Sequence, residues 1–159
     1  MLKKFFKHIL SFFFTKLAKL NLTTKSSIKV NFYSKFTSKT YIEDDCHFNG
    51  LRVSGKGCVF IGSGFHCGKS CEIITDVHNY HGASLPYDDT YIIKDVTIKK
   101  NVWFGQGVTI LGGVTIGEGA IVQAKSVVVS DVPDFAIVGG HPAKTFAERD
   151  KAHYYSLVE

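Results

Sequence analysis

A strict period of six residues runs through this chain between Ile92 and Pro133. An apolar residue returns at every sixth position, and these anchors are Ile92, Ile98, Phe104, Ile110, Ile116, Val122 and Val128. A small or branched residue follows each anchor by four places, at Val96, Val102, Val108, Val114, Ala120, Ser126 and Val132. A helix repeats its buried face about every 3.6 residues and a strand every second residue, so neither element alone explains the period. The pattern predicts a coil of short strands joined by corners.

The third residue after each anchor indicates where the chain turns. These positions hold Asp95, Asn101, Gly107, Gly113, Gly119, Lys125 and Asp131. Glycine, asparagine and aspartate adopt the left-handed backbone conformation at comparatively low cost, which places the third position at a corner. Repeats of this kind bury their apolar residues only by stacking on neighbouring repeats. The chain is therefore expected to be all-β and to form a parallel β-helix.

Several stretches within the repeats are similar to one known family. They are Asn101 to Gly105, Val108 to Gly117, Asp131 to Pro133, and Gly139 to Lys144 with the sequence Gly-Gly-His-Pro-Ala-Lys. Over residues 61–146 the chain resembles the hexapeptide-repeat acyltransferases, which fold as a left-handed parallel β-helix. The resemblance is closest to the sugar O-acetyltransferase branch, with its maltose, galactoside, xenobiotic and polysaccharide acetyltransferases.

The resemblance implies an enzyme that moves the acetyl group of acetyl-CoA directly to a saccharide hydroxyl, as in polysaccharide biosynthesis. It implies no covalent enzyme intermediate and no metal. It also implies a homotrimer in which each active site lies between subunits, so that a monomer would be inactive. Because a shared scaffold does not fix the substrate, the resemblance leaves open which sugar and which hydroxyl are used.

The chain of 159 residues has the size of one domain. We expect an amphipathic helix over residues 1–22, an irregular cap and first coils over 23–60, the main β-helix over 61–133, and a C-terminal loop and short helix over 134–159. The spacing of six fails between Ile73 and Ile92, where the sequence is polar and aromatic. This failure predicts a loop, residues 79–91, that leaves the coil and is a natural place for function.

Residues 1–22 combine a polar stripe at helical spacing with phenylalanine and leucine over most of the remaining surface. The stripe consists of Lys4, Lys7, His8, Ser11, Thr15 and Lys19. Such a helix fits either an in-plane membrane anchor or a helix that packs on the body or on a sister subunit. A membrane span and a signal peptide are not expected, because the apolar run is interrupted and no small-residue cleavage site follows it. Contact with the inner membrane face would favour a lipid-linked or surface-polysaccharide acceptor.

Charge and cysteine content bear on two further properties, nucleic-acid binding and cellular location. The net charge of +5 comes largely from the amino terminus, so it does not favour nucleic-acid binding by the repeats. The four cysteines are Cys46, Cys58, Cys67 and Cys71, and the last two occupy inward positions of one repeat. Reduced core thiols are expected, which favours a cytoplasmic location.

Acetyl transfer to a hydroxyl needs a general base, and histidine is the natural base near neutral pH. The repeat that starts at Ile73 ends at His78, directly before the extruded loop. In the family that the chain resembles, the catalytic histidine holds this place, so His78 is the expected base and His81 is the alternative. Asp76 is expected either to orient the imidazole or to occupy a corner because of its backbone tolerance.

Polar loop residues are candidates for contacts with the acceptor. Asn79, Tyr80 and Tyr87, together with Asp88 and Asp89, could bind sugar hydroxyls, although ordinary loop polarity explains them equally well.

The resemblance also implies that acetyl-CoA lies along an edge of the coil. The matching positions are Trp103, Gly105, Ala124, Lys125, Ser130 and Lys144. Trp103 and Gly105 would lie near the thioester, Ala124 and Ser130 along the pantetheine arm, and Lys144 near a phosphate. Lys125 is expected either to add a phosphate contact or to be a solvated corner.

Three other functions remain open. Serine acetyltransferases and amino-sugar N-acetyltransferases share the fold and differ in the acceptor. A γ-type carbonic anhydrase would need histidines around zinc, for which His66, His78 and His81 are candidates. A non-enzymatic scaffold anchored to a membrane by residues 1–22 would bind no acetyl-CoA.

Overall fold

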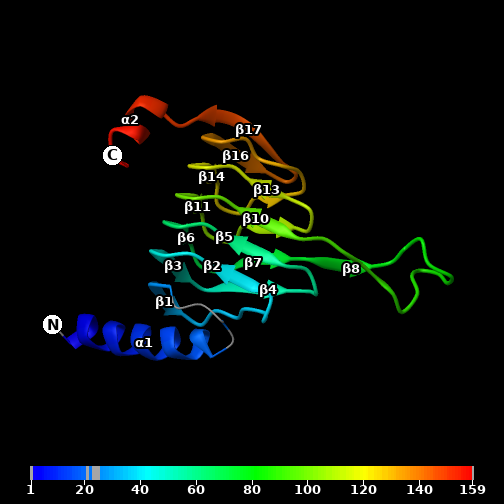
Figure 1. Cartoon of the computed structure of the whole chain (residues 1–159), viewed down its shortest axis with the longest axis horizontal. Coiled ribbons are helices and arrows are strands. Elements are labelled where there is room, and N and C mark those ends of the chain that lie inside the picture. The colour runs from blue at the N-terminus through cyan, green and yellow to red at the C-terminus, as the bar shows by residue number, and fades with distance from the viewer. Residues whose placement is uncertain (1, 21, 23–25, 159) are drawn as a thin grey trace.

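The computed structural model describes residues 2–20, 22 and 26–158. Short strands stack turn upon turn into a parallel β-helix, with α1 (Leu2–Lys19) across the N-terminal end and α2 (Lys151–Tyr155) at the C-terminal end (Figure 1). The predicted fold, a parallel β-helix of hexapeptide repeats, is confirmed.

The strands of the coil form three faces. The seven-stranded face contains β1 (Ile28–Phe32), β3 (Cys46–Asn49), β6 (His66–Cys67), β11 (Trp103–Phe104), β14 (Ile121–Val122), β16 (Ala136–Gly140) and β17 (Ala143–Glu148). The β7 face contains β4 (Leu51–Ser54), β7 (Cys71–Ile74), β12 (Thr109–Leu111) and β15 (Val127–Val128). The β10 face contains β2 (Thr40–Ile42), β5 (Val59–Ile61), β10 (Val96–Ile98) and β13 (Thr115–Ile116).

Inward side chains stack directly above one another in successive turns. Phe104 lies between Cys67 and Val122, and Ile98 lies in register with the neighbouring isoleucines of β5 and β13. All the predicted anchors from Ile98 onward are buried, as are all the residues four places after an anchor. The core is therefore a continuous column of the residues that the period of six selects.

Ile92 is the exception, and its assignment as an inward anchor of the coil is wrong. It lies in β9 (Tyr91–Ile93), which pairs antiparallel with β8 (Asp76–His78) in a separate two-stranded ribbon. Its side chain is only partly buried. The coil resumes at Val96, because β10 is the first strand after the ribbon to join a coil face.

The predicted corners are confirmed at Asn101, Lys125 and three glycines, where φ is positive. Asp95 and Asp131 are not among the residues with positive φ. Their carboxylates instead accept hydrogen bonds from the backbone N–H groups of Cys58 and Thr115, both at 2.7 Å. Aspartate at these two positions links one turn to the next rather than easing a left-handed corner.

The C-terminal segment contains more strand than predicted. Residues 134–159 were expected as a loop and a helix, but β16 and β17 form an antiparallel pair before a helix of five residues. The helix is held on the last coils by Tyr154, whose hydroxyl accepts a hydrogen bond from Asn101 and donates one to Glu118. The strand pair extends the seven-stranded face, which explains why the chain keeps a β conformation after Pro133.

Helix α1 packs on β1 through two residues of its polar stripe, Ser11 and Thr15. The Ser11 hydroxyl donates to the side-chain oxygen of Asn31 at 3.2 Å, and the Thr15 hydroxyl accepts from the backbone N–H of Val30 at 3.0 Å. Phe14 packs against the core beside them. Packing on the body, one of the two predicted arrangements, is thus observed. Within the described residues, no helix is long and apolar enough to cross a membrane.

All four cysteines are free thiols, and Cys46, Cys67 and Cys71 are buried. Burial raises the pKa of the Cys46 thiol to about 11. These side chains fill the core as small apolar groups, as the repeat positions predicted.

The stacked core predicts a large cost for removing one inward ring. Phe104 is fully buried and packs edge-on against Phe65, with ring centroids 5.0 Å apart. Phe104→Ala should lower the free energy of unfolding by about 3–5 kcal/mol because it leaves a cavity between two turns. Urea unfolding followed by circular dichroism measures this. Phe60→Ala, which removes an outward ring that is 43% exposed, is the control, and an equal loss from both variants would contradict the stacked-core account.

Candidate active site

The ribbon of β8 and β9 places His78 outside the coil. His78 lies opposite Tyr91 at the outer end of the strand pair, and residues 79–90 form the loop beyond it. The ribbon and its loop project from the stacked coils (Figure 1). The predicted loop, residues 79–91, lies in this projecting segment, although Tyr91 belongs to its second strand.

The imidazole of His78 is held between two aromatic rings. It stacks on Tyr87 with centroids 3.8 Å apart and an interplanar angle of 15°, and it lies 4.7 Å from the ring of Tyr91. Its Nδ1 atom is buried and has no hydrogen-bond partner among the described residues. A buried ring nitrogen without a partner is uncommon, and a catalytic role is one of the explanations for such an atom.

Asp76 begins the same strand, and its interpretation as a corner residue is wrong. Alternate strand residues point to the same side, so Asp76 and His78 share one side of the ribbon. Asp76 also lines a groove of about 210 Å³ at the base of the ribbon. The other groove residues include Tyr80 from the loop and Ile74 and Leu111 from β7 and β12, so the groove joins the ribbon to the β7 face.

His81 lies in different surroundings from His78. Its ring packs on Tyr80, with centroids 4.4 Å apart, and the residue is exposed. Its backbone N–H donates to the side-chain oxygen of Asn79, whose amide nitrogen donates to the Thr90 hydroxyl at 2.9 Å. The side chain of Asn79 therefore links the two ends of the loop.

Asp88 organises the rest of the loop, a role that the sequence interpretation missed. Its carboxylate accepts hydrogen bonds from the backbone N–H of Ala83 and from both the N–H and the hydroxyl of Thr90. The Thr90 hydroxyl contributes most to lowering the pKa of Asp88. An aspartate two residues before a threonine is a common turn motif, so the spacing of Asp88 and Thr90 was the available signal.

The residues predicted for acetyl-CoA lie on the coil rather than on the ribbon. Gly105 contacts Ala124 so closely that a Cβ atom on Gly105 would lie 2.5 Å from the Ala124 nitrogen. Lys125 occupies a left-handed corner with φ 64°. Ser130 and Lys144 are exposed, the latter on β17. Gly105 and Ala124 thus lie in close contact where two turns meet.

The seven-stranded face brings two histidines together beside Trp103. His47 and His66 are neighbours in register, with ring centroids 4.3 Å apart, and Trp103 follows His66 in the next turn. Burial, followed by the nearby His47, lowers the pKa of His66. His66 is therefore on a coil face, whereas His78 and His81 are on the extruded segment. Across the described residues, no group of three or more His, Cys, Asp or Glu side chains is arranged to hold a metal ion.

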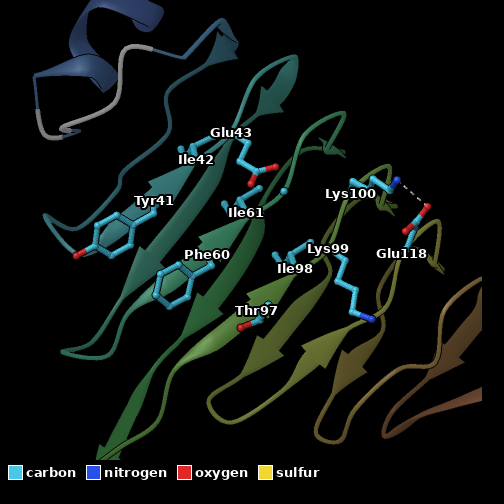
Figure 2. Close-up of a pocket in the computed structure, with 11 residues that line it drawn as sticks. Tyr41, Ile42, Glu43, Phe60, Ile61, Thr97, Ile98, Lys99, Lys100 and Glu118 are labelled. Carbon is cyan, nitrogen blue, oxygen red and sulfur yellow. Dashed lines mark ion pairs between the residues drawn. The ribbon is translucent and has the colours of Figure 1, made fainter. Parts of the chain in front are cut away.

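A second groove, of about 440 Å³, lies on the β10 face. Figure 2 shows Tyr41 and Phe60 side by side on neighbouring strands, and Lys100 paired with Glu118 across the groove. None of the residues predicted for catalysis or for acetyl-CoA lines this groove. Although it is larger than the groove beside Asp76, no residue of the ribbon or its loop lines it, so it is not the candidate active site.

Comparison with known proteins identifies the family. Residues 95–130 match the family described as bacterial transferase hexapeptide (six repeats). A hexapeptide-repeat-containing acetyltransferase of Vibrio cholerae O1 biovar eltor, solved in complex with acetyl-coenzyme A, is 30% identical to this chain. The superposition covers 86% of this chain and 76% of that chain, with a TM-score of 0.72. This chain belongs to the hexapeptide-repeat acyltransferase family.

Two curated relatives in this family carry different names. A chloramphenicol acetyltransferase of Agrobacterium fabrum is 38% identical over 48% of this chain and 34% of its own length. A serine acetyltransferase of Bacillus subtilis is 36% identical over 64% of this chain and 48% of its own length. The chain thus spans between a third and a half of these relatives. Membership of the hexapeptide-repeat acyltransferases accounts for the fold and does not decide the acceptor.

The hydrogen bonds of Asp88 predict the behaviour of the loop. Asp88→Ala should increase amide hydrogen exchange over residues 79–90, because Ala83 and Thr90 lose their shared acceptor. Since the pKa of Asp88 is lowered in the folded chain, the bonds are present above the usual aspartate pKa and are lost as the pH falls through the folded value. Asp89→Ala is the matched control. Unchanged exchange in the Asp88 variant would show that other contacts hold the loop.

Proposed function

We propose that this chain transfers the acetyl group of acetyl-CoA to a hydroxyl group of a saccharide. Use of acetyl-CoA is supported by the Vibrio cholerae relative, which was solved in complex with it. The observation that carries the proposal is His78, a histidine on an extruded ribbon, packed between two tyrosines, with one buried nitrogen left unpaired by the described residues.

His78 acts as the general base in this proposal. It takes the proton of the acceptor hydroxyl while the hydroxyl oxygen attacks the thioester carbonyl. The tetrahedral intermediate then breaks its C–S bond, and the leaving thiolate takes the proton from the imidazolium to give CoA. Packing against Tyr87 and Tyr91 supports this role, because it restricts rotation of the ring and keeps the base positioned.

Asp76 and Tyr80 are the proposed contacts with the acceptor. Both line the groove at the base of the ribbon, and Asp76 lies on the same side of β8 as His78. Asn79 is a weaker candidate than the sequence suggested, because its side-chain amide group already forms hydrogen bonds with the Thr90 hydroxyl and the backbone N–H of His81. Tyr87 would contribute chiefly by holding the imidazole.

The carrier and the second subunit complete the proposed site. Acetyl-CoA would lie along the edge formed by Gly105 and Ala124, with its thioester end toward Trp103 and a phosphate toward Lys144. The proposed enzyme is a homotrimer, in which the projecting ribbon of one subunit reaches the coil edge of another. Its buried, reduced thiols support a cytoplasmic location.

A second acceptor class is supported by the curated relatives. The serine acetyltransferase of Bacillus subtilis shares 36% identity with this chain, so serine and amino sugars are candidate acceptors on the same fold. Release of free CoA thiol in the presence of neutral saccharides, amino sugars or serine distinguishes these acceptors. Thiol release with serine alone would replace the saccharide in the proposal.

The assignment of the base predicts two different outcomes within one loop. His78→Ala should lower the rate of acetyl transfer about a thousandfold, because the hydroxyl loses its proton acceptor, while acetyl-CoA affinity changes little. Initial rates of CoA thiol release and isothermal titration with acetyl-CoA measure the two quantities.

His81→Ala is the matched control, since it removes an exposed imidazole three residues away. Its transfer rate should stay within a few-fold of the parent protein. An equally large loss in His81→Ala, with normal activity in His78→Ala, would transfer the role of base to His81. Circular dichroism and sedimentation velocity check that both variants keep their fold and assembly.

A further inference from the structure

Several large apolar side chains of α1 point away from the protein. Ser11 and Thr15 face β1, Ala18 is buried on the same side, and Phe14 packs against the core. The large apolar side chains that stay exposed are Phe6, Ile9, Leu10, Phe12 and Phe13 on α1 and Leu20 directly after it. Their exposed fractions run from 48% at Ile9 to 79% at Leu20, so the coil does not cover them. We call these six side chains the outer face of α1.

An exposed apolar surface of this kind usually has a partner. Five of these side chains lie on one helix and Leu20 follows it directly, whereas single exposed apolar residues are normal on any surface. The helix lies across the N-terminal end of the coil (Figure 1), so the patch occupies one end of the molecule and is distant in the fold from the ribbon of His78.

The charge of the helix indicates the kind of partner. Leu2–Lys19 contains five lysines and no acidic residue. Lys16 lies over the ring of Phe12, with its ammonium nitrogen 4.6 Å from the ring centroid, and Lys16 and Lys19 are both exposed. Apolar rings with lysines beside them match the boundary between acyl chains and anionic headgroups of a lipid bilayer.

We propose that the outer face of α1 binds the surface of a membrane that contains anionic phospholipids. The phenylalanines enter the boundary between headgroups and acyl chains, and the lysines contact the phosphates. The N-terminal end of the coil then faces the bilayer, and the ribbon remains in water. This inference goes beyond the proposed acetyl transfer and does not depend on it.

A second copy of the chain is a poorer occupant for this face. Each α1 helix carries five lysines and no acidic residue, so two such helices placed face to face repel each other. An anionic bilayer supplies the opposite charge and an apolar layer at once. The same lysines that oppose pairing of two helices therefore favour the lipid surface.

Sedimentation with vesicles tests the proposal on the full chain. The parent protein should sediment with vesicles of phosphatidylcholine and phosphatidylglycerol, bind vesicles of phosphatidylcholine alone at least about tenfold more weakly, and be released from the anionic vesicles as salt is raised. Phe6→Ser/Phe13→Ser should weaken binding to the anionic vesicles at least about tenfold. Lys16→Gln/Lys19→Gln should also weaken it about tenfold and reduce its dependence on salt.

Phe60→Ser/Phe146→Ser is the matched control, because it removes two exposed phenylalanines that lie on β5 and β17. Its binding to vesicles should equal that of the parent protein. Circular dichroism checks that every variant is folded. Acetyl transfer to a soluble acceptor, where it is detected, should be unchanged in Phe6→Ser/Phe13→Ser, which keeps failure of this proposal separate from failure of the proposed function.

Three results would overturn the membrane proposal. The first is absence of the folded parent protein from the anionic vesicle pellet, and the second is equal binding by Phe6→Ser/Phe13→Ser. The third is a change of assembly: if sedimentation velocity shows that Phe6→Ser/Phe13→Ser forms smaller particles than the parent protein and neither binds vesicles, the outer face of α1 joins copies of the chain instead.

Discussion

Stacking of inward side chains between successive turns is the interaction on which the whole molecule depends. Each turn is too small to enclose a core, and its apolar residues leave water only against the turns above and below. Phe104 illustrates this, since its ring fills the space between Cys67 and Val122 of the adjacent turns and meets Phe65 edge-on. Because every turn must repeat the same spacing to stack, the six-residue period is a requirement of packing and not only a feature of the sequence.

The same requirement explains where an irregular segment can be tolerated. A chain that leaves the coil must return in register, and the ribbon does this by pairing β8 with β9 on their own, so that Thr75 and Lys94 lie next to each other at its base. The ribbon contributes little to the column of buried residues, so its sequence is free to carry polar and aromatic groups. The coil gives the ribbon a rigid support, and Tyr87 and Tyr91 position the imidazole ring of His78.

The sequence predicted the repeating parts of the fold correctly. The prediction failed where the same residue type can serve either the coil or another structural role. Burial of Ile98 and of the later anchors follows from spacing alone. Ile92 satisfies the same spacing by coincidence, and only its pairing with Val77 shows that it belongs to the ribbon. Aspartate caused the second kind of failure. Asp95 was assigned to a corner but bonds to the preceding turn, and Asp76 begins a strand although a corner was one of its two expected places. Spacing identifies a position but cannot distinguish backbone tolerance from a long-range hydrogen bond.

The sequence predicted the part of the candidate site that depends only on position along the chain. His78 stands out because a repeat ends there, but its stacking on Tyr87 joins residues across a loop whose path is set by Asp88 and Thr90.

The orientation of α1 could not be predicted from the sequence either. Its amphipathic pattern shows two sides without indicating which one faces the protein. The first strand of the coil decides this, because the backbone N–H of Val30 needs an acceptor that Thr15 provides and that a phenylalanine side could not provide. Covering that strand edge explains why Ser11 and Thr15 face inward, but it places no demand on the outer side, where polar residues would serve equally well. The six exposed apolar side chains are therefore not a consequence of capping the coil, and their presence requires a separate physical reason.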